Sequence, residues 1–481
     1  MDPQPIVTIR HWSEFHQAGQ VLAACLADLG GLERFIRPGQ TVVVKPNITA
    51  SGPASSGGTT HVELVEALVH QVWRCAPSRI VVAEGTFTFG TTQEAGFPVG
   101  GWREMAARTG VELYNLDAGP HTELTLPGAR YPHPLPFSQF IVDADVYISV
   151  PCLKTHINCD YTVALKNGYG LIPGWKRSEI HRQYLLEQAL VDLNRIRKPD
   201  LVIVDGWEGA EGIAGGSSFT SPAGARLLLA GDDPVAVDVV SRQIMGLPGR
   251  TRYLDWAIED GVGVGDPARI QVTGLQVADC CRPFRWPAHE LMELMPGLVV
   301  HDLGACSGCR SAALTAAYRF AHQKLLKPLT VVFGKEGEPP PCSADTIVAG
   351  DCAAHLGHLG MHIAGCPAGV PEIVAAMERL GCICQRCHDV AHQALAGFAP
   401  ASLPHLRVAA AGSEVFVGAE VKRTEWHQEL LVGDCMERYA AAVLERSPQL
   451  GMVPGKDVVW LRGCPVEEAE VRAVLQRLSE S

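Results

Sequence analysis

The chain has 481 residues, of which 47% are hydrophobic and 19% charged, and its formal net charge is −12. This composition is typical of a globular protein of about three domains, and without a basic stripe we expect no nucleic-acid partner. No run of ~18 apolar residues is present, so we expect no membrane span. Because the N-terminus lacks the basic start and apolar run of a signal peptide, we expect a cytoplasmic protein.

Residues 1–275 alternate short apolar runs with amphipathic helical patterns. The runs that predict buried strands are Thr41–Val44, Arg79–Ala83, Asp145–Val150, Leu201–Val204 and Arg226–Ala230. Helical patterns lie between them at His61–Trp73 and Tyr184–Ile196, and Asp233-Pro234 is typical of a capped helix start. This alternation favours an α/β domain with a largely parallel sheet, whose functional residues lie at the C-terminal ends of strands.

Residues 276–296 form a junction without clear periodicity, and the composition changes after it. Ten of the sixteen cysteines lie after residue 300. In a reducing compartment such a concentration indicates metal binding or redox chemistry rather than disulfides.

The C-terminal part contains a pattern that occurs twice. Gly350-Asp351-Cys352 follows a strand-like run, and Gly365-Cys366-Pro367 follows another before the helix-like Val370–Leu380. Gly433-Asp434-Cys435, Gly463-Cys464-Pro465 and the helix-like Glu467–Leu478 repeat that order. Each copy is preceded by a Cys-x-x-Cys, so we predict two duplicated lobes, residues 297–381 and 382–481.

Each lobe supplies four cysteines, the number that holds a [4Fe–4S] cluster. The first set is Cys306, Cys309, Cys352 and Cys366, and the second is Cys384, Cys387, Cys435 and Cys464. Structural zinc also takes four thiolates, but its sites usually pair two close Cys-x-x-Cys knuckles. We therefore predict a cluster on the first set and a second cluster on the second set, with zinc or free thiols as the alternatives. Cys342 and Cys382 are interpreted as buried apolar residues, and the nearby His355, His358 and His362 as solvated or capping side chains.

The order Cys-x-x-Cys, isolated Cys and Gly-Cys-Pro resembles that of nickel–iron hydrogenase small subunits and the related complex I subunit. The resemblance covers only these motifs and their element order. It implies one [4Fe–4S] cluster on each of two small flavodoxin-like α/β lobes.

The densest polar stretch of the N-terminal domain begins with Lys154-Thr155-His156, directly after an apolar strand. It continues through Thr162, Lys166-Asn167 and Pro173-Gly174 to His181. A helix over residues 161–167 would put Thr162 and Lys166 on one face.

This series, together with Lys45-Pro46-Asn47, Asp205-Gly206 and Glu211-Gly212, resembles the domain-of-unknown-function 362 family over residues 5–275. Members of that family often carry iron–sulfur modules. A weaker resemblance is to lactate racemases, which hold a nickel pincer nucleotide. Here the paired glycines of that motif are absent and Lys166 lies seven residues before Pro173.

The residue types of the N-terminal site are suited to an anionic ligand. Lysines neutralise a carboxylate or phosphate, histidines transfer protons near neutral pH, and carboxylates orient lysines or bind a hard cation. We assign catalytic roles to Lys154, His156, Lys166 and His181. We assign ligand or cofactor binding to Lys45, Asn47, Thr155, Asn167, Asp205 and Glu211.

The sequence predicts an iron–sulfur oxidoreductase that passes electrons to a small anionic substrate or cofactor, with a ferredoxin-like protein as a possible electron donor. The alternatives are an accessory protein that delivers electrons, cluster or metal, and a non-redox racemase or lyase with structural clusters. Neither a dinucleotide-binding glycine motif nor a Walker loop occurs in the sequence.

Overall fold

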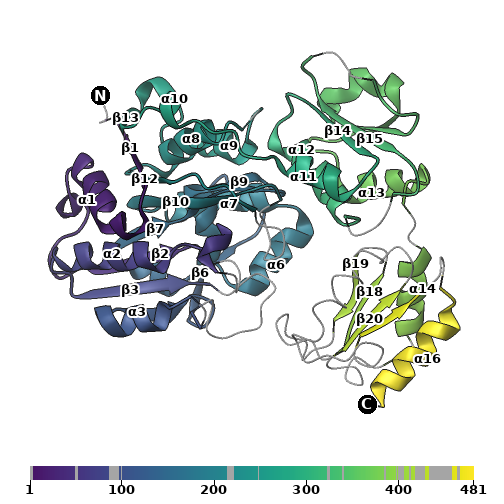
Figure 1. Ribbon diagram of the computed structural model, residues 1–481, viewed down its shortest axis with the longest axis horizontal. Coiled ribbons are helices and arrows are strands. Elements are labelled where there is room, and N and C mark those ends of the chain that lie inside the picture. The colour runs from purple at the N-terminus through teal and green to yellow at the C-terminus, as the bar shows by residue number, and fades with distance from the viewer. Residues whose placement is uncertain are drawn as a thin grey trace. The chain divides into compact units, whose positions relative to one another are not determined.

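A computed structural model describes most of the N-terminal part of the chain and several segments of the C-terminal part. The described residues are 4–48, 53–85, 97–98, 100–213, 221–247, 249–321, 325–337, 341–383, 386–396, 398, 406–410, 413–417, 428–432, 458–462 and 466–480. The chain divides into two compact units, Met1–Pro287 and Ala288–Ser481 (Figure 1). Across the described ranges, no helix combines the length and the apolar character needed to cross a bilayer.

The N-terminal unit is built on one large mixed sheet with the order β13-β1-β12-β10-β7-β2-β3-β4. Its strands are β1 (Ile6–His11), β2 (Thr41–Pro46), β3 (Arg79–Glu84), β4 (Glu112–Asn115), β7 (Val146–Val150), β10 (Leu201–Glu211), β12 (Leu227–Gly231) and β13 (Gln271–Gly274). The short strands β8 (Cys152–His156), β9 (Asp160–Thr162) and β11 (Ser221–Pro222) branch from β10. A separate hairpin pairs β5 (His121–Leu124) with β6 (Leu135–Ser138). The pairs from β10 through β4 are parallel and only β12 runs against both its neighbours, so the predicted largely parallel sheet is confirmed.

Helices cover both faces of this sheet. They are α1 (Ala18–Asp28), α2 (Val62–Trp73), α3 (Trp102–Thr109), α4 (Gln139–Asp143), α5 (Ala164–Asn167), α6 (Gly174–Gln183), α7 (Leu186–Ile196), α8 (Pro234–Ile244), α9 (Arg252–Glu259) and α10 (Val277–Cys280). Val42 and Val44 of β2 pack into a core with α1, α2 and α3, whereas Val43 faces a second core with α7, α8 and α9. The alternation follows from the two-residue repeat of a strand and gives a three-layer arrangement.

Most elements predicted for the N-terminal domain are confirmed with boundaries shifted by a few residues. The five predicted strands correspond to β2, β3, β7, β10 and β12, and the two predicted helices correspond to α2 and α7. The predicted cap is also present, because the Asp233 carboxylate accepts hydrogen bonds from the backbone N–H groups of Val235 and Ala236.

The prediction of a helix over residues 161–167 is wrong. Asp160 adopts a positive φ of 66°, and the chain reverses into β9, where Thr162 pairs with Lys154 of β8. The helix α5 begins only at Ala164. Thr162 therefore lies on a strand, and Lys166 projects from the short helix that follows it.

The first sheet of the C-terminal unit is wholly parallel, with the order β14-β15-β16-β17. Its strands are β14 (Leu298–Leu303), β15 (Leu329–Gly334), β16 (Thr346–Ala349) and β17 (Met361–Ile363). The helices of this part are α11 (Pro287–Leu294), α12 (Ser307–Tyr318) and α13 (Val370–Arg379). After β16 the chain enters a 3₁₀ helix, Asp351–Leu359, instead of an α-helix.

The second sheet has the order β19-β18-β20-β21. Its strands are β18 (Leu406–Ala410), β19 (Ser413–Val417), β20 (Gln428–Val432) and β21 (Val458–Leu461), and its helices are α14 (Arg386–Leu395) and α16 (Glu468–Ser479). The Gly-Asp-Cys and Gly-Cys-Pro segments follow neighbouring parallel strands in both sheets, β16 and β17 in the first and β20 and β21 in the second. The sheets differ at one edge, because the antiparallel β19 stands where the first sheet has the parallel β14.

Candidate functional site

A buried ion pair lies at the C-terminal ends of two adjacent strands of the large sheet. Lys45, from the end of β2, places Nζ 2.8 Å from Oε1 of Glu84, at the end of β3. Both side chains are almost completely buried, with 1% and 4% of their surface exposed. Because β2 and β3 are parallel, both strands end at the same edge of the sheet. In α/β proteins this edge is where ligands bind.

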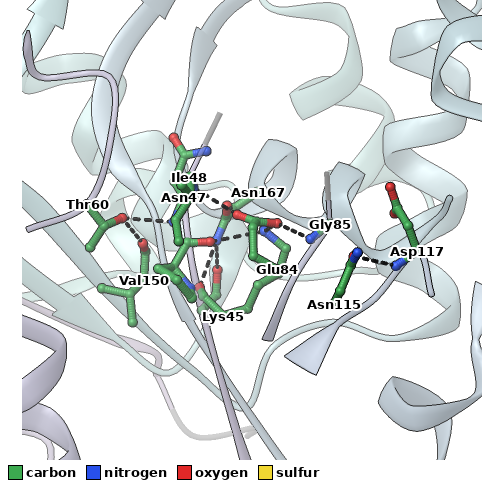
Figure 2. A network of polar contacts seen from close by, with 12 residues as sticks. Lys45, Asn47, Ile48, Thr60, Glu84, Gly85, Asn115, Asp117, Val150 and Asn167 are labelled. Carbon is green, nitrogen blue, oxygen red and sulfur yellow. Dashed lines mark hydrogen bonds and ion pairs between the residues drawn. The ribbon is translucent and has the colours of Figure 1, made fainter. Parts of the chain in front are cut away.

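The hydrogen bonds around this pair are nearly complete (Figure 2). Lys45 Nζ also donates to Oδ1 of Asn167 and to the carbonyl of Pro46, both at 3.1 Å. Glu84 accepts from the backbone N–H groups of Ile48 and Gly85. Burial lowers the pKa of Lys45, and the Glu84 carboxylate opposes that effect. The pair is therefore a fixed, internally neutral element of the site.

Asn167 joins the helix α5 to the strand ends. Its Nδ2 donates to the Lys45 carbonyl at 3.2 Å and to the Ser149 hydroxyl of β7 at 2.8 Å. The residue before it, Lys166, is thereby held beside Lys45. Asp238 fixes the other end of α5, since its carboxylate accepts from the N–H groups of Ala164 at 2.7 Å and Leu165 at 3.4 Å.

The two other predicted lysines differ in their contacts. Lys154 Nζ donates to the Gly58 carbonyl at 3.0 Å. Burial, together with the charges of Lys166 and Lys45, lowers the pKa of Lys154 to about 8. Lys166, on α5, forms no hydrogen bond or ion pair with any residue that the structure describes, and burial lowers its pKa, with a smaller contribution from Lys45. The structure thus brings Lys45, Lys154 and Lys166 together with one partnered carboxylate, Glu84.

Two histidines lie beside the lysines. Burial lowers the pKa of His156, on β8, well below its usual value, and the charge of Lys166 adds to this. The same causes lower the pKa of His181, on α6, to about 3. Near neutral pH both imidazoles are therefore uncharged, and the positive charge of the site comes from the lysines.

Because these histidines are uncharged in the folded state, we expect the folded protein to lose stability in acid. Because the pKa of His181 is about 3 in the folded state and 6.5 in the unfolded state, only the unfolded chain gains its proton between these values. We expect the free energy of unfolding to fall by up to about 1.4 kcal/mol per pH unit over this window, and His181→Gln to remove that dependence. Urea unfolding at several pH values measures it, and the exposed His70→Gln is the control. An unchanged pH slope in His181→Gln would contradict the prediction.

Three of the residues predicted to bind a ligand use their side chains for hydrogen bonds to other parts of the protein. Thr155 donates to the Gly212 carbonyl at 2.6 Å. Glu211 accepts from the backbone N–H of Arg285 at 3.0 Å. Asp205 accepts from both the backbone N–H and Nδ1 of His61, at 2.7 and 2.9 Å. Asn47 is buried near the site, and its Oδ1 has no hydrogen-bond partner in the described part of the chain.

His61, which sequence reasoning used only as the start of a helix, lines a pocket of about 390 Å³ together with Phe15, Thr60, Trp102, Trp207 and Glu208. Burial lowers the pKa of His61, but the hydrogen bond to Asp205 and the negative charges of Asp205, Glu63 and Glu208 together outweigh burial and raise it. The glycine-rich Gly57-Gly58 directly before Thr59-Thr60-His61 is the one signal in the sequence that marks this segment. The arrangement fixes Nδ1 on Asp205, so only Nε2 remains for another partner.

Arg177 and Asp117 were also missed. The Arg177 guanidinium donates to both carboxylate oxygens of Asp117, at 3.1 and 2.9 Å. A Cβ at Gly85 would approach Arg177 Nη1 to 2.9 Å, so this second ion pair lies directly beside the end of β3. Asp117 lies in a turn outside every recognised motif, and no spacing in the sequence indicates its contact with Arg177.

The first cysteine set meets at the ends of β16 and β17. Cys309, at the start of α12, lies against Gly350, and a Cβ at Gly350 would come within 2.4 Å of its Sγ. Burial raises the pKa of Cys309 to about 12, and the nearby Cys306, Cys352 and Cys366 contribute in the same direction. All four cysteines are free thiols, and among the described residues no three His, Cys, Asp or Glu side chains are arranged around a single metal position.

The ends of the two strands are also fixed to each other. The Asp351 N–H donates to the Gly365 carbonyl at 3.0 Å, and its carboxylate accepts from the Gly365 N–H at 2.7 Å. The histidines of this part contact the main chain or solvent, for example His362 with the Gly350 carbonyl. Of the second set, Cys384, Cys435 and Cys464 lie outside the described residues, and for Cys387 only the backbone, in α14, is described.

A family profile matches part of the N-terminal unit. Residues 42–243 match the sequence profile of the family described as "Domain of unknown function (DUF362)". A thylakoid-associated protein, sll1697, of Synechocystis sp. is 28% identical over 253 residues, which is 50% of this chain and 74% of that protein.

Two solved structures have low similarity to this chain. The lactate racemase apoprotein from Thermoanaerobacterium thermosaccharolyticum has a TM-score of 0.28 and 12% identity, over 70% of this chain and 71% of that one. A Thermotoga maritima protein has a TM-score of 0.30 and 11% identity, over 92% and 96%. Scores this low bear on neither fold nor function, so the assignment depends on the profile and on the cyanobacterial relative. The segment that matches the DUF362 profile, residues 42–243, contains the Lys45–Glu84 pair, Lys154, Lys166 and both histidines.

Proposed function

We propose that the protein is an iron–sulfur oxidoreductase that passes electrons to a small anionic substrate or cofactor held by the lysines of the DUF362 domain. The observation that carries the proposal is that Cys306, Cys352 and Cys366, from three separate segments of the chain, all lie near Cys309. Four thiolates around one position are the usual protein ligands of a [4Fe–4S] cluster.

The donor set fits such a cluster in its chemistry and its surroundings. Gly350 leaves the space that the Cys309 sulfur occupies, and the Ala368 N–H donates to that sulfur. Hydrogen bonds to the sulfurs and partial exposure are among the features that tune the potential of a bound cluster. When bound, the cluster would supply single electrons. The second set would hold a second cluster in the same manner.

The lysine site supports the anionic class of substrate. Lys154 is a buried lysine with a pKa of about 8, and Glu84, the nearby acid, is already paired with Lys45. Burial of uncompensated positive charge is unfavourable, so an anion bound here would be strongly favoured. The proposal includes a cytoplasmic location and a ferredoxin-like electron donor.

The test is anaerobic purification followed by iron and sulfide analysis and EPR spectroscopy. We expect about eight iron atoms per chain, as two four-iron clusters require. Cys366→Ser should remove about half of the iron, and Cys342→Ser, which lies outside both sets, should retain all of it. A colourless protein with stoichiometric zinc would overturn the proposal in favour of a structural metal site.

A further inference from the structure

The amino group of Lys166 differs from those of its two neighbours. Lys45 Nζ is bound by the Glu84 carboxylate and by Asn167, and Lys154 Nζ by the Gly58 carbonyl. Lys166 Nζ has no acceptor among the described residues, although the side chain is only partly exposed. An amine without an acceptor among the described residues is available to a ligand.

The position of Lys166 is determined by contacts at both ends of α5. Asn167 binds the ends of β2 and β7, and Asp238 binds the first two N–H groups of the helix. The backbone of Lys166 is therefore fixed in a short helix that is anchored to the ends of β2 and β7. Catalytic groups are most effective when a rigid shell positions them in this way.

The surroundings also favour the neutral amine. Burial and the neighbouring Lys45 lower the pKa of Lys166, while His156 and His181 stay uncharged and supply no proton. A desolvated lysine beside other cations is the arrangement in which an amine reacts as a nucleophile toward carbonyl carbon. A site that only binds anions has no need for such a group.

We propose that Lys166 forms an imine with the carbonyl carbon of a 2-oxo carboxylate whose carboxylate group lies beside Lys154. This inference rests on the anionic substrate class of the proposed function and narrows it. The amine nitrogen attacks the carbonyl carbon to give a carbinolamine, which then loses water. The carbonyl oxygen leaves as water together with the two protons of the neutral amine. A C–N double bond replaces the C–O double bond, and the step needs no oxidant or reductant.

Reductive trapping tests the imine on the intact chain. The protein is incubated with pyruvate or 2-oxoglutarate and sodium cyanoborohydride, and the adduct is located by peptide mass mapping. We expect one dominant adduct, on Lys166, whose yield approaches its maximum at a lower pH than the ordinary lysine pKa of 10.5 would allow. Since the adduct is located on the wild-type chain, this result does not depend on the folding of any variant.

A pair of variants sharpens the result. Lys166→Arg keeps the positive charge but cannot form an imine, so the adduct should fall by roughly tenfold or more. Lys176→Arg is the matched control, because Lys176 lies in the same domain but is paired with Glu179. Its adduct yield should equal that of the wild type.

The possible failures are distinguishable. If the adduct is absent, spread over surface lysines or found on Lys154, the imine at Lys166 is overturned. Thermal shifts with pyruvate and with sulfate, in wild type and in Lys154→Gln, report on anion binding separately. A shift that depends on Lys154 without an adduct would overturn the imine and leave the proposed anion site standing. The absence of both would overturn the two together.

Discussion

Replacing Glu84 by Gln is expected to destabilise the N-terminal unit by about 3–5 kcal/mol, because it leaves the buried Lys45 without its counter-charge. The carboxylate and the ammonium are 2.8 Å apart and almost fully enclosed. A buried cation that has lost its partner tends to release its proton, so the loss should shrink as the pH rises toward 10. Lys45→Met should be similarly costly, since it isolates the Glu84 carboxylate instead.

Urea unfolding followed by tryptophan fluorescence measures this effect, because seven of the nine tryptophans lie in residues 1–287. The double variant Lys45→Met with Glu84→Leu should recover much of the stability, since neither charge remains buried. The control is Glu112→Gln. Its partner is Arg79 and the two side chains are 55% and 41% exposed, so the expected cost is below about 1 kcal/mol. Equal losses for Glu84→Gln and Glu112→Gln would refute the argument.

Gly350→Ala is expected to abolish metal binding by the first cysteine set and so to remove about half of the iron. The new Cβ would lie 2.4 Å from Cys309 Sγ, and the φ of +99° at this position is one that residues with a side chain rarely adopt. The sulfur of Cys309 must then move from its present position near Cys306, Cys352 and Cys366.

Gly357→Ala is the matched control in the same segment. Its added Cβ would have a nearest contact of 3.8 Å, to Cβ of His362, which is an ordinary van der Waals distance. Iron analysis of both variants after anaerobic purification checks the expectation. Full iron content in Gly350→Ala would contradict the assignment of Cys309 as a metal ligand in its position against Gly350.

The elements of the N-terminal unit could be predicted because short apolar runs and capping residues act locally. Lys45 lies at the end of β2, at an edge where parallel strands terminate, whereas Lys154 lies on β8 and Lys166 on α5. Asp160 marks the limit of this reasoning. Its positive φ places Thr162 in a hairpin with β8, and a polar-apolar pattern of seven residues cannot distinguish that hairpin from a helical turn.

The partners of the site residues were less accessible to sequence reasoning. Glu84 ends an ordinary buried strand, and its role follows only from the adjacency of β2 and β3. His61 and Arg177 acquire their roles from Asp205 and Asp117, which are 144 and 60 residues away in the chain. Such side-chain contacts depend on the order of the strands in the sheet. The pattern of residues in one sequence does not specify that order.

The position of β1 in the large sheet has a consequence for how the protein is made. β1 is synthesised before every other strand of the large sheet, yet its neighbours β12 and β13 are among the last of the unit. The backbone N–H of Ile6 binds Asp232, 226 residues further along the chain. Val7 and Ile9 are fully buried in the folded unit. Their side chains therefore stay exposed to solvent until the more than 200 residues that separate them from β12 have been synthesised. Contacts of such long range form slowly, so this edge of the sheet is where a nascent chain would depend most on protection from aggregation.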